Sequence, residues 1–167
     1  MNVGMETIRE RMAEYLNGQG VEARTAWPEG ERKQPDGPVV LVSLRACKVG
    51  AGGFQDYLGE RYNEETGLWE ELYGRKAELT FGLDLYAPAR GDGADLQAAF
   101  DRLAAALTRG GPEGLAAKGF SCGETEYDSR ARLCKRGAQA VYTAWLCAAP
   151  QPGQAFVDFE LRGGLTT

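Results

Sequence analysis

The sequence predicts an α+β fold, a mostly antiparallel sheet with two helices packed on one face and a long projecting β-hairpin. The apparent elements follow the order helix, strands, helix, strands, which is typical of helices segregated to one side of an antiparallel sheet. Residues 77–86 alternate apolar and polar side chains, the period of a half-buried strand. Residues 54–88 contain two strand-like runs around the polar turn 63–67, which ends in glycine and so predicts one long hairpin.

The first part of the chain predicts a helix and a strand. Apolar residues repeat at helical spacing up to the stop signals Gly18 and Gly20, and the predicted buried face consists of Met5, Ile8, Met12, Tyr15 and Leu16. Residues 21–27 favour a strand. Residues 28–38 combine charges with proline and glycine, which indicates a loop.

The middle and end of the chain supply the remaining elements. Residues 39–47 predict a central strand, and the glycine-rich residues 48–53 predict a bend into the hairpin. Asp92 is the expected N-cap of a second helix that ends at the Gly110-Gly111-Pro112 run. A second hairpin is expected at residues 120–127 and 133–149 around Asp128, followed by a last strand at residues 155–162.

The strands at residues 39–44 and 141–147 are apolar on both faces, and Trp145 lies within the second of them. Two short helices cover only one face of such a sheet. The other face therefore needs a cover, either the hairpin or a neighbouring subunit. We expect a homo-oligomer on this ground.

Composition limits the classes of function. A chain of 167 residues is one domain by default, here residues 1–167, and can bury about 70 % of its unfolded surface. The net charge of −5, with no basic run, disfavours sequence-specific nucleic acid as a partner. No apolar run approaches the roughly 20 residues of a membrane span, and the first residues lack a signal-peptide pattern. We therefore expect no membrane partner and a cytoplasmic location.

Catalytic and metal chemistry find no support in the sequence. Residues 119–123 match the Gly-x-Ser-x-Gly nucleophile motif, but a strand-like run follows Ser121 and the chain has no histidine to activate it. The four cysteines include no Cys-x-x-Cys pair, so free thiols are expected. Cys122 and Cys134 lie symmetrically around Asp128 and could face each other across two strands. We predict no catalytic residue, no metal and no cofactor.

The candidate site is the outer part of the first hairpin, residues 54–73, which we call the arm. Aromatic groups on a projecting arm usually need a partner to bury them. The alternative is ordinary cross-strand pairing, which stabilises a hairpin by roughly 0.2–1 kcal/mol per pair. We favour contact with another subunit and predict the interface residues Tyr57, Leu58, Tyr62, Leu68, Trp69 and Tyr73.

The arm and its surroundings also resemble a known family. The runs at residues 57–60, 73–76 and 83–88, and the last strand at 156–163, are similar to small tail proteins of prophages in Gram-positive bacteria, above all tail terminator (tail completion, minor tail) proteins. The resemblance covers most of the chain as a diffuse pattern and contains no motif that defines a chemistry. It implies an α/β or α+β protomer with a projecting hairpin and a ring that is commonly six-fold.

We therefore expect a non-enzymatic tail assembly protein. The resemblance implies a ring-like homo-oligomer, possibly a hexamer, that ends the tail tube, with the tail tube protein and a head completion protein as partners. The protein would then pass from the host cytoplasm into the virion tail. A head–tail stopper or a baseplate component is the alternative within virion assembly. A small-ligand-binding or enzymatic α+β domain is the alternative of another class.

Overall fold

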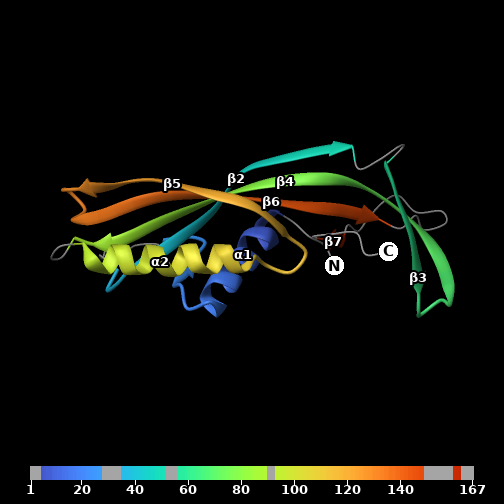
Figure 1. The fold of residues 1–167 in the computed structure, drawn as a ribbon, viewed down its shortest axis with the longest axis horizontal. Helices are drawn as coiled ribbons and strands as arrows, with labels where there is room; N and C mark the ends of the chain where they lie inside the picture. The colour runs from blue at the N-terminus through green and yellow to red at the C-terminus, as the bar shows by residue number, and fades with distance from the viewer. Residues whose placement is uncertain (1–4, 28–34, 52–55, 90–92, 149–159, 163–167) are drawn as a thin grey trace.

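The computed structural model describes residues 5–27, 35–51, 56–89, 93–148 and 160–162. In this part of the chain, seven strands form one sheet with the path β1-β2-β4-β6-β5, while β3 pairs with β4 and β7 pairs with β6. Two helices complete an α+β fold (Figure 1). The elements are α1 (Met5–Gly18), β1 (Ala23–Arg24), β2 (Val39–Ala51), β3 (Tyr57–Asn63), β4 (Leu68–Pro88), α2 (Ala94–Arg109), β5 (Ala116–Asp128), β6 (Leu133–Ala148) and β7 (Glu160–Arg162).

The core lies between the sheet and the two helices, which both pack on one face (Figure 1). The predicted alternation in β4 is confirmed, because its odd-numbered residues are buried in this core: Ala77, Leu79, Phe81, Leu83 and Leu85. Met12 and Leu16, on the predicted buried face of α1, are fully buried, and so is Leu103 of α2. Period-two and period-3.6 patterns therefore meet in one apolar layer.

Two tyrosine hydroxyls satisfy backbone carbonyls at the C-terminal end of α2. Tyr15 donates to the carbonyl oxygen of Ala106 at 2.8 Å, and Tyr142 donates to that of Gly110 at 2.9 Å. The last carbonyls of a helix have no partner within the helix, so these bonds tie α2 to α1 and to β6. Burial, with a smaller effect of Tyr15, raises the pKa of Tyr142 to about 12.

We predict that Tyr142 makes the fold sensitive to alkali. Its pKa is about 12 in the folded chain and close to 10 in the unfolded chain, so its contribution is complete below pH 10 and is lost as the pH rises through 12. The loss should reach about 3 kcal/mol, since each pKa unit corresponds to about 1.4 kcal/mol. Tyr142→Phe should cost about 1 kcal/mol at neutral pH for the missing hydrogen bond, yet approach or exceed wild-type stability at high pH. Urea unfolding of both proteins across this range measures the difference, and parallel pH profiles would contradict it.

Several predicted boundaries are wrong. The strand expected at residues 21–27 is reduced to the two residues of β1, which pair parallel to β2. The side chain of Asn17 accepts the backbone N–H of Ala23 and donates to its carbonyl oxygen, at 3.0 Å each, so both backbone groups of Ala23 bond to a side chain. The bend expected from Lys48 onwards is also wrong, because β2 continues to Ala51 through antiparallel pairing with β4.

The ends of other elements differ as well. The N-cap of α2 is Gly93 in the left-handed conformation, with no side-chain capping bond, rather than Asp92, which lies outside the described residues. The end of the helix at Arg109, followed by Gly110 at φ 139°, is as predicted. Of the last predicted strand, the structure describes Glu160–Arg162, and the rest lies outside the described residues.

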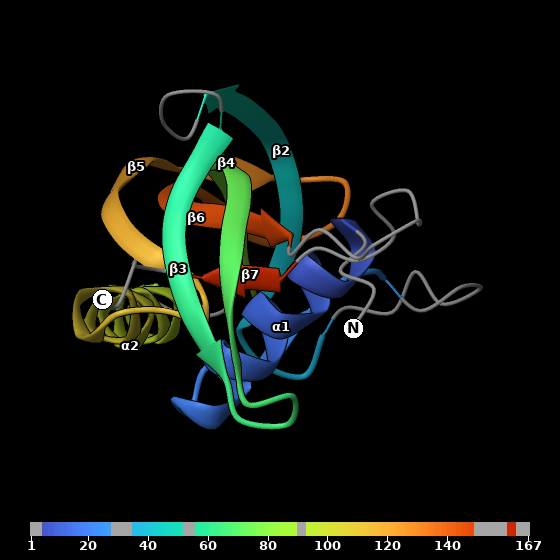
Figure 2. The same ribbon diagram turned by 90° about the vertical axis from the view of Figure 1, so that its right-hand side faces the viewer.

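The expected single hairpin over residues 54–88 is also corrected. β3 pairs with only the first part of β4, residues 68–73, and the remaining length of β4 pairs with β2 and β6. The arm bends toward the side of the sheet that carries the helices (Figure 1). Seen end-on, β3 and the start of β4 run across the ends of the other strands (Figure 2). The arm therefore does not cover the face of the sheet opposite the helices, which was one of the two covers expected.

Candidate subunit interface

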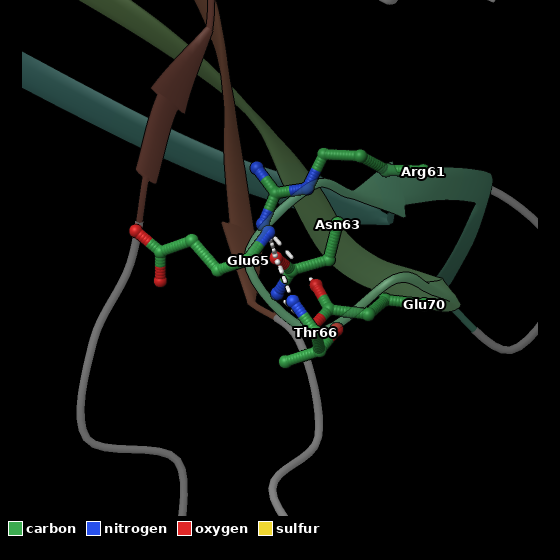
Figure 3. A network of polar contacts seen from close by, with 5 residues as sticks. All are labelled: Arg61, Asn63, Glu65, Thr66 and Glu70. Carbon is green, nitrogen blue, oxygen red and sulfur yellow. Dashed lines mark hydrogen bonds and ion pairs between the residues drawn. The ribbon is translucent and has the colours of Figure 1, made fainter.

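The tip of the arm is held by side chains on both of its strands (Figure 3). Asn63 Oδ1 accepts the backbone N–H of Glu65 at 2.9 Å and that of Thr66 at 3.3 Å. Asn63 Nδ2 donates to Glu70 Oε1 at 2.6 Å, and Arg61 Nη2 lies 3.5 Å from Glu70 Oε2. Gly67, at φ 69°, donates its N–H to the carbonyl of Asn63 and closes the predicted turn. The tip is thus an ordered turn.

The base of the arm is shaped by glycine and by an ion pair. The register of β3 shifts between Tyr57 and Gly59, and Gly59 has φ 126°. Asp56 Oδ2 lies 3.3 Å from Arg75 Nη2, which joins the start of β3 to β4. A Cβ on Gly74 would lie 2.0 Å from the carbonyl oxygen of Leu146 in β6. This close backbone approach occurs where β4 leaves the sheet and enters the arm.

The predicted aromatic residues form two cross-strand pairs on one face of the arm. Tyr57 pairs with Tyr73 and Tyr62 pairs with Trp69 in the strand register. In both pairs the ring centroids lie 5.6 Å apart and the rings meet edge to face. This geometry is worth about 0.5–1.5 kcal/mol per pair, so the alternative of cross-strand pairing describes real contacts.

Cross-strand pairing nevertheless leaves much of the apolar surface of the arm, on both of its faces, exposed. Trp69 is 69 % exposed and Leu68 is 65 % exposed, while Tyr62 and Tyr57 are close to half exposed. The other two predicted interface residues, Leu58 and Tyr73, are half-buried. Leu72 is buried within the chain and is therefore not available to a partner. Four of the six predicted residues thus present large apolar groups to solvent.

Two carboxylates lie between the aromatic pairs. Glu60 and Glu71 are direct cross-strand partners, with Tyr57 and Tyr73 on one side and the Tyr62–Trp69 pair on the other. The hydroxyl of Tyr73 donates to Glu71 Oε2 at 2.7 Å, and this bond is the main reason that the pKa of Tyr73 is raised. Desolvation, followed by the charges of Glu60 and Glu71, raises the pKa of Tyr57. The exposed face of the arm is therefore aromatic and acidic.

The structure also contains a second charged region, which the sequence did not predict. Strand register brings Lys48 of β2, Lys76 and Glu78 of β4, and Lys118 of β5 around a hollow of about 660 Å³ on the face of the sheet opposite the helices. Lys118 Nζ lies 2.7 Å from Glu78 Oε2, and this hydrogen bond lowers the pKa of Glu78. The alternation of Lys76 and Glu78 was visible in the sequence, but the register of the four strands β2, β4, β6 and β5 was not.

The residues considered for catalysis or metal binding do not form a site for either. Ser121 lies within β5 on an exposed strand, so the strand-to-helix turn of a nucleophile elbow is absent there. Cys122 pairs with Ala138 and Cys134 with Tyr127, so the expectation that these cysteines could face each other is wrong. Both thiols are free. Among the described residues, no group of three or more cysteine or carboxylate side chains is placed to hold a metal ion.

A comparison with protein-family models found no match, and a comparison with curated proteins found none either. In the part of the chain that the structure describes, no helix combines the length and apolar character needed to cross a membrane.

Proposed function

We propose that this chain is a non-enzymatic phage tail assembly protein, a tail terminator that forms a ring at the end of the tail tube. The observation that carries the proposal is the arm, an ordered hairpin at one end of the molecule with two aromatic pairs, in which Tyr57, Tyr62 and Trp69 are exposed. Large exposed aromatic groups on one element usually mark a contact with another protein. The tail tube protein and a head completion protein would be its other partners.

A ring requires that two different patches of one subunit meet, because a head-to-tail contact closes when its rotation is a simple fraction of a turn. The arm supplies one patch. Burying the exposed two-thirds of one tryptophan, at roughly 25 cal/mol per Å², would contribute about 3 kcal/mol. Part of this gain offsets the loss of translational freedom on association, so the free protein is expected to associate weakly and to assemble at higher concentration.

Trp69→Ala should weaken self-association far more than it lowers the stability of the monomer. Removing an interface aromatic often costs 2 kcal/mol or more, which corresponds to a rise of about 30-fold in the dissociation constant. Sedimentation velocity across a concentration series measures the association, and negative-stain images at the highest concentration should show closed rings for the wild type only.

The matched control is Trp27→Ala. Trp27 lies outside the arm, where its ring packs edge to face on Tyr86 at 5.4 Å. Its removal should lower stability and leave the association constant unchanged. If Trp69→Ala instead unfolds the domain while the stoichiometry stays as in the wild type, the tryptophan serves the hairpin alone and the arm loses its role in assembly.

A further inference from the structure

The lysine hollow and the arm carry opposite charges. The hollow gathers three lysines and one glutamate, so its formal net charge at neutral pH is about +2. Between residues 54 and 73, the arm, the chain has six carboxylates and one arginine. The arm therefore holds most of the negative charge of a protein whose net charge is −5.

The carboxylates of the arm are arranged unfavourably for an isolated subunit. Glu60 and Glu71 face each other across the strands, and like charges directly opposite each other destabilise a sheet. A cation placed between the two aromatic pairs would relieve this repulsion. Lysine suits the position, because an ammonium group is attracted both to carboxylates and to the faces of aromatic rings. Lys76 already shows such a contact, with Nζ 5.9 Å from the centre of the Trp145 ring.

The arm of a subunit does not reach the hollow of the same subunit. The arm bends toward the helices (Figure 1), whereas the even-numbered residues of β4 that line the hollow point to the opposite face of the sheet. Any contact between the two must therefore join different copies. Such a contact pairs two unlike patches and is head-to-tail, the kind from which closed rings are built.

We propose that the Glu60–Glu71 pair of one copy docks on the hollow lined by Lys48, Lys76 and Lys118 of the next copy. This docking rests on the ring assembly proposed above and names the second patch of its interface. The aromatic pairs on either side of the carboxylates would contact the rim of the hollow and exclude water from the ion pairs. Exclusion of water strengthens a charge pair, since fewer solvent dipoles screen it.

Charge reversal tests the docking. Glu71→Lys and Lys48→Glu should each raise the dissociation constant of self-association about tenfold or more, in line with measured coupling between close interface charges. Combining both changes in one chain should restore association to within about threefold of the wild type, because the pair is then reversed rather than broken. Raising the ionic strength should weaken association of the wild type.

The Glu71→Lys variant distinguishes the proposed docking from electrostatic repulsion between whole subunits. This change lowers the magnitude of the net charge from −5 to −3, so repulsion between whole molecules would predict stronger association. Docking predicts weaker association. The controls Glu124→Lys in β5 and Arg102→Glu in α2 alter the net charge by the same amounts at exposed positions away from both patches, and should change association little. Urea unfolding of each variant establishes that it is folded.

The outcomes distinguish the two proposals. If both single reversals associate as the wild type does while Trp69→Ala does not, the docking on the hollow is overturned and ring assembly through the arm stands. If each single variant associates weakly and the combined variant is no better, the two residues do not meet and the docking is again overturned. A wild-type chain that remains monomeric at high concentration and low salt contradicts both.

Discussion

Phe81→Ala is expected to lower the free energy of unfolding by about 3–5 kcal/mol, the range for deleting a fully buried aromatic side chain. Phe81 is completely buried at the centre of the core, and its ring meets that of Tyr142 edge to face at 5.7 Å. Its cross-strand neighbour on β6 is Ala140, which is too small to fill the space left behind. Since whole domains are stable by only about 5–15 kcal/mol, much of the stability would be lost.

Urea denaturation measures this loss, and Thr80→Ala is the matched control. Thr80 is the preceding residue on the same strand and points to the opposite face, where it is half-buried. Its replacement should cost about 1 kcal/mol or less. Equal losses at the two positions would mean that the core does not lie on the side of the sheet that carries the helices.

Gly74→Ala is expected to destabilise the domain by about 1–3 kcal/mol and to loosen the junction between the arm and the sheet. The added Cβ would lie 2.0 Å from the carbonyl oxygen and 2.8 Å from the carbonyl carbon of Leu146. Both are backbone atoms, so no side-chain rotation relieves the clash, and β4 and β6 must separate. Hydrogen exchange should become faster at residues 73–76 of β4 and at the end of β6.

Gly50→Ala is the control for this change. Gly50 also lies within a strand, but a Cβ there would have no heavy atom within 4 Å. Its replacement should alter stability by no more than about 0.5 kcal/mol, and could stabilise by restricting the unfolded chain. If Gly74→Ala behaves in the same way, the close approach at the base of the arm does not constrain the fold.

The arm shows how much of the candidate site could be predicted from the sequence. The turn at residues 63–67 could be predicted, because the side chain of asparagine and the conformational freedom of glycine act within five residues. The extent of the hairpin could not. β4 has one continuous apolar–polar pattern, and the point at which it changes partner from β3 to β6 depends on where the ends of other strands lie.

The placement of the aromatic side chains could also be predicted from the sequence only in part. Their presence on the arm followed from the pattern, but whether each faces a partner strand, the core or solvent depends on register. A bulge at the start of β3 aligns Tyr57 with Tyr73, and burial of Leu72 removes that residue from the exposed surface. A shift of one residue would exchange the two faces of the arm.

By itself, the sequence determined the α+β class, the buried face of α1 and the buried side of β4. These features depend on local periodicity, which compares residues only a few positions apart. The tertiary structure alone decided that Lys48, Lys76 and Lys118 share a hollow and that the arm bends away from it. These residues come from three strands, and contacts between strands depend on pairing and twist that no single segment encodes.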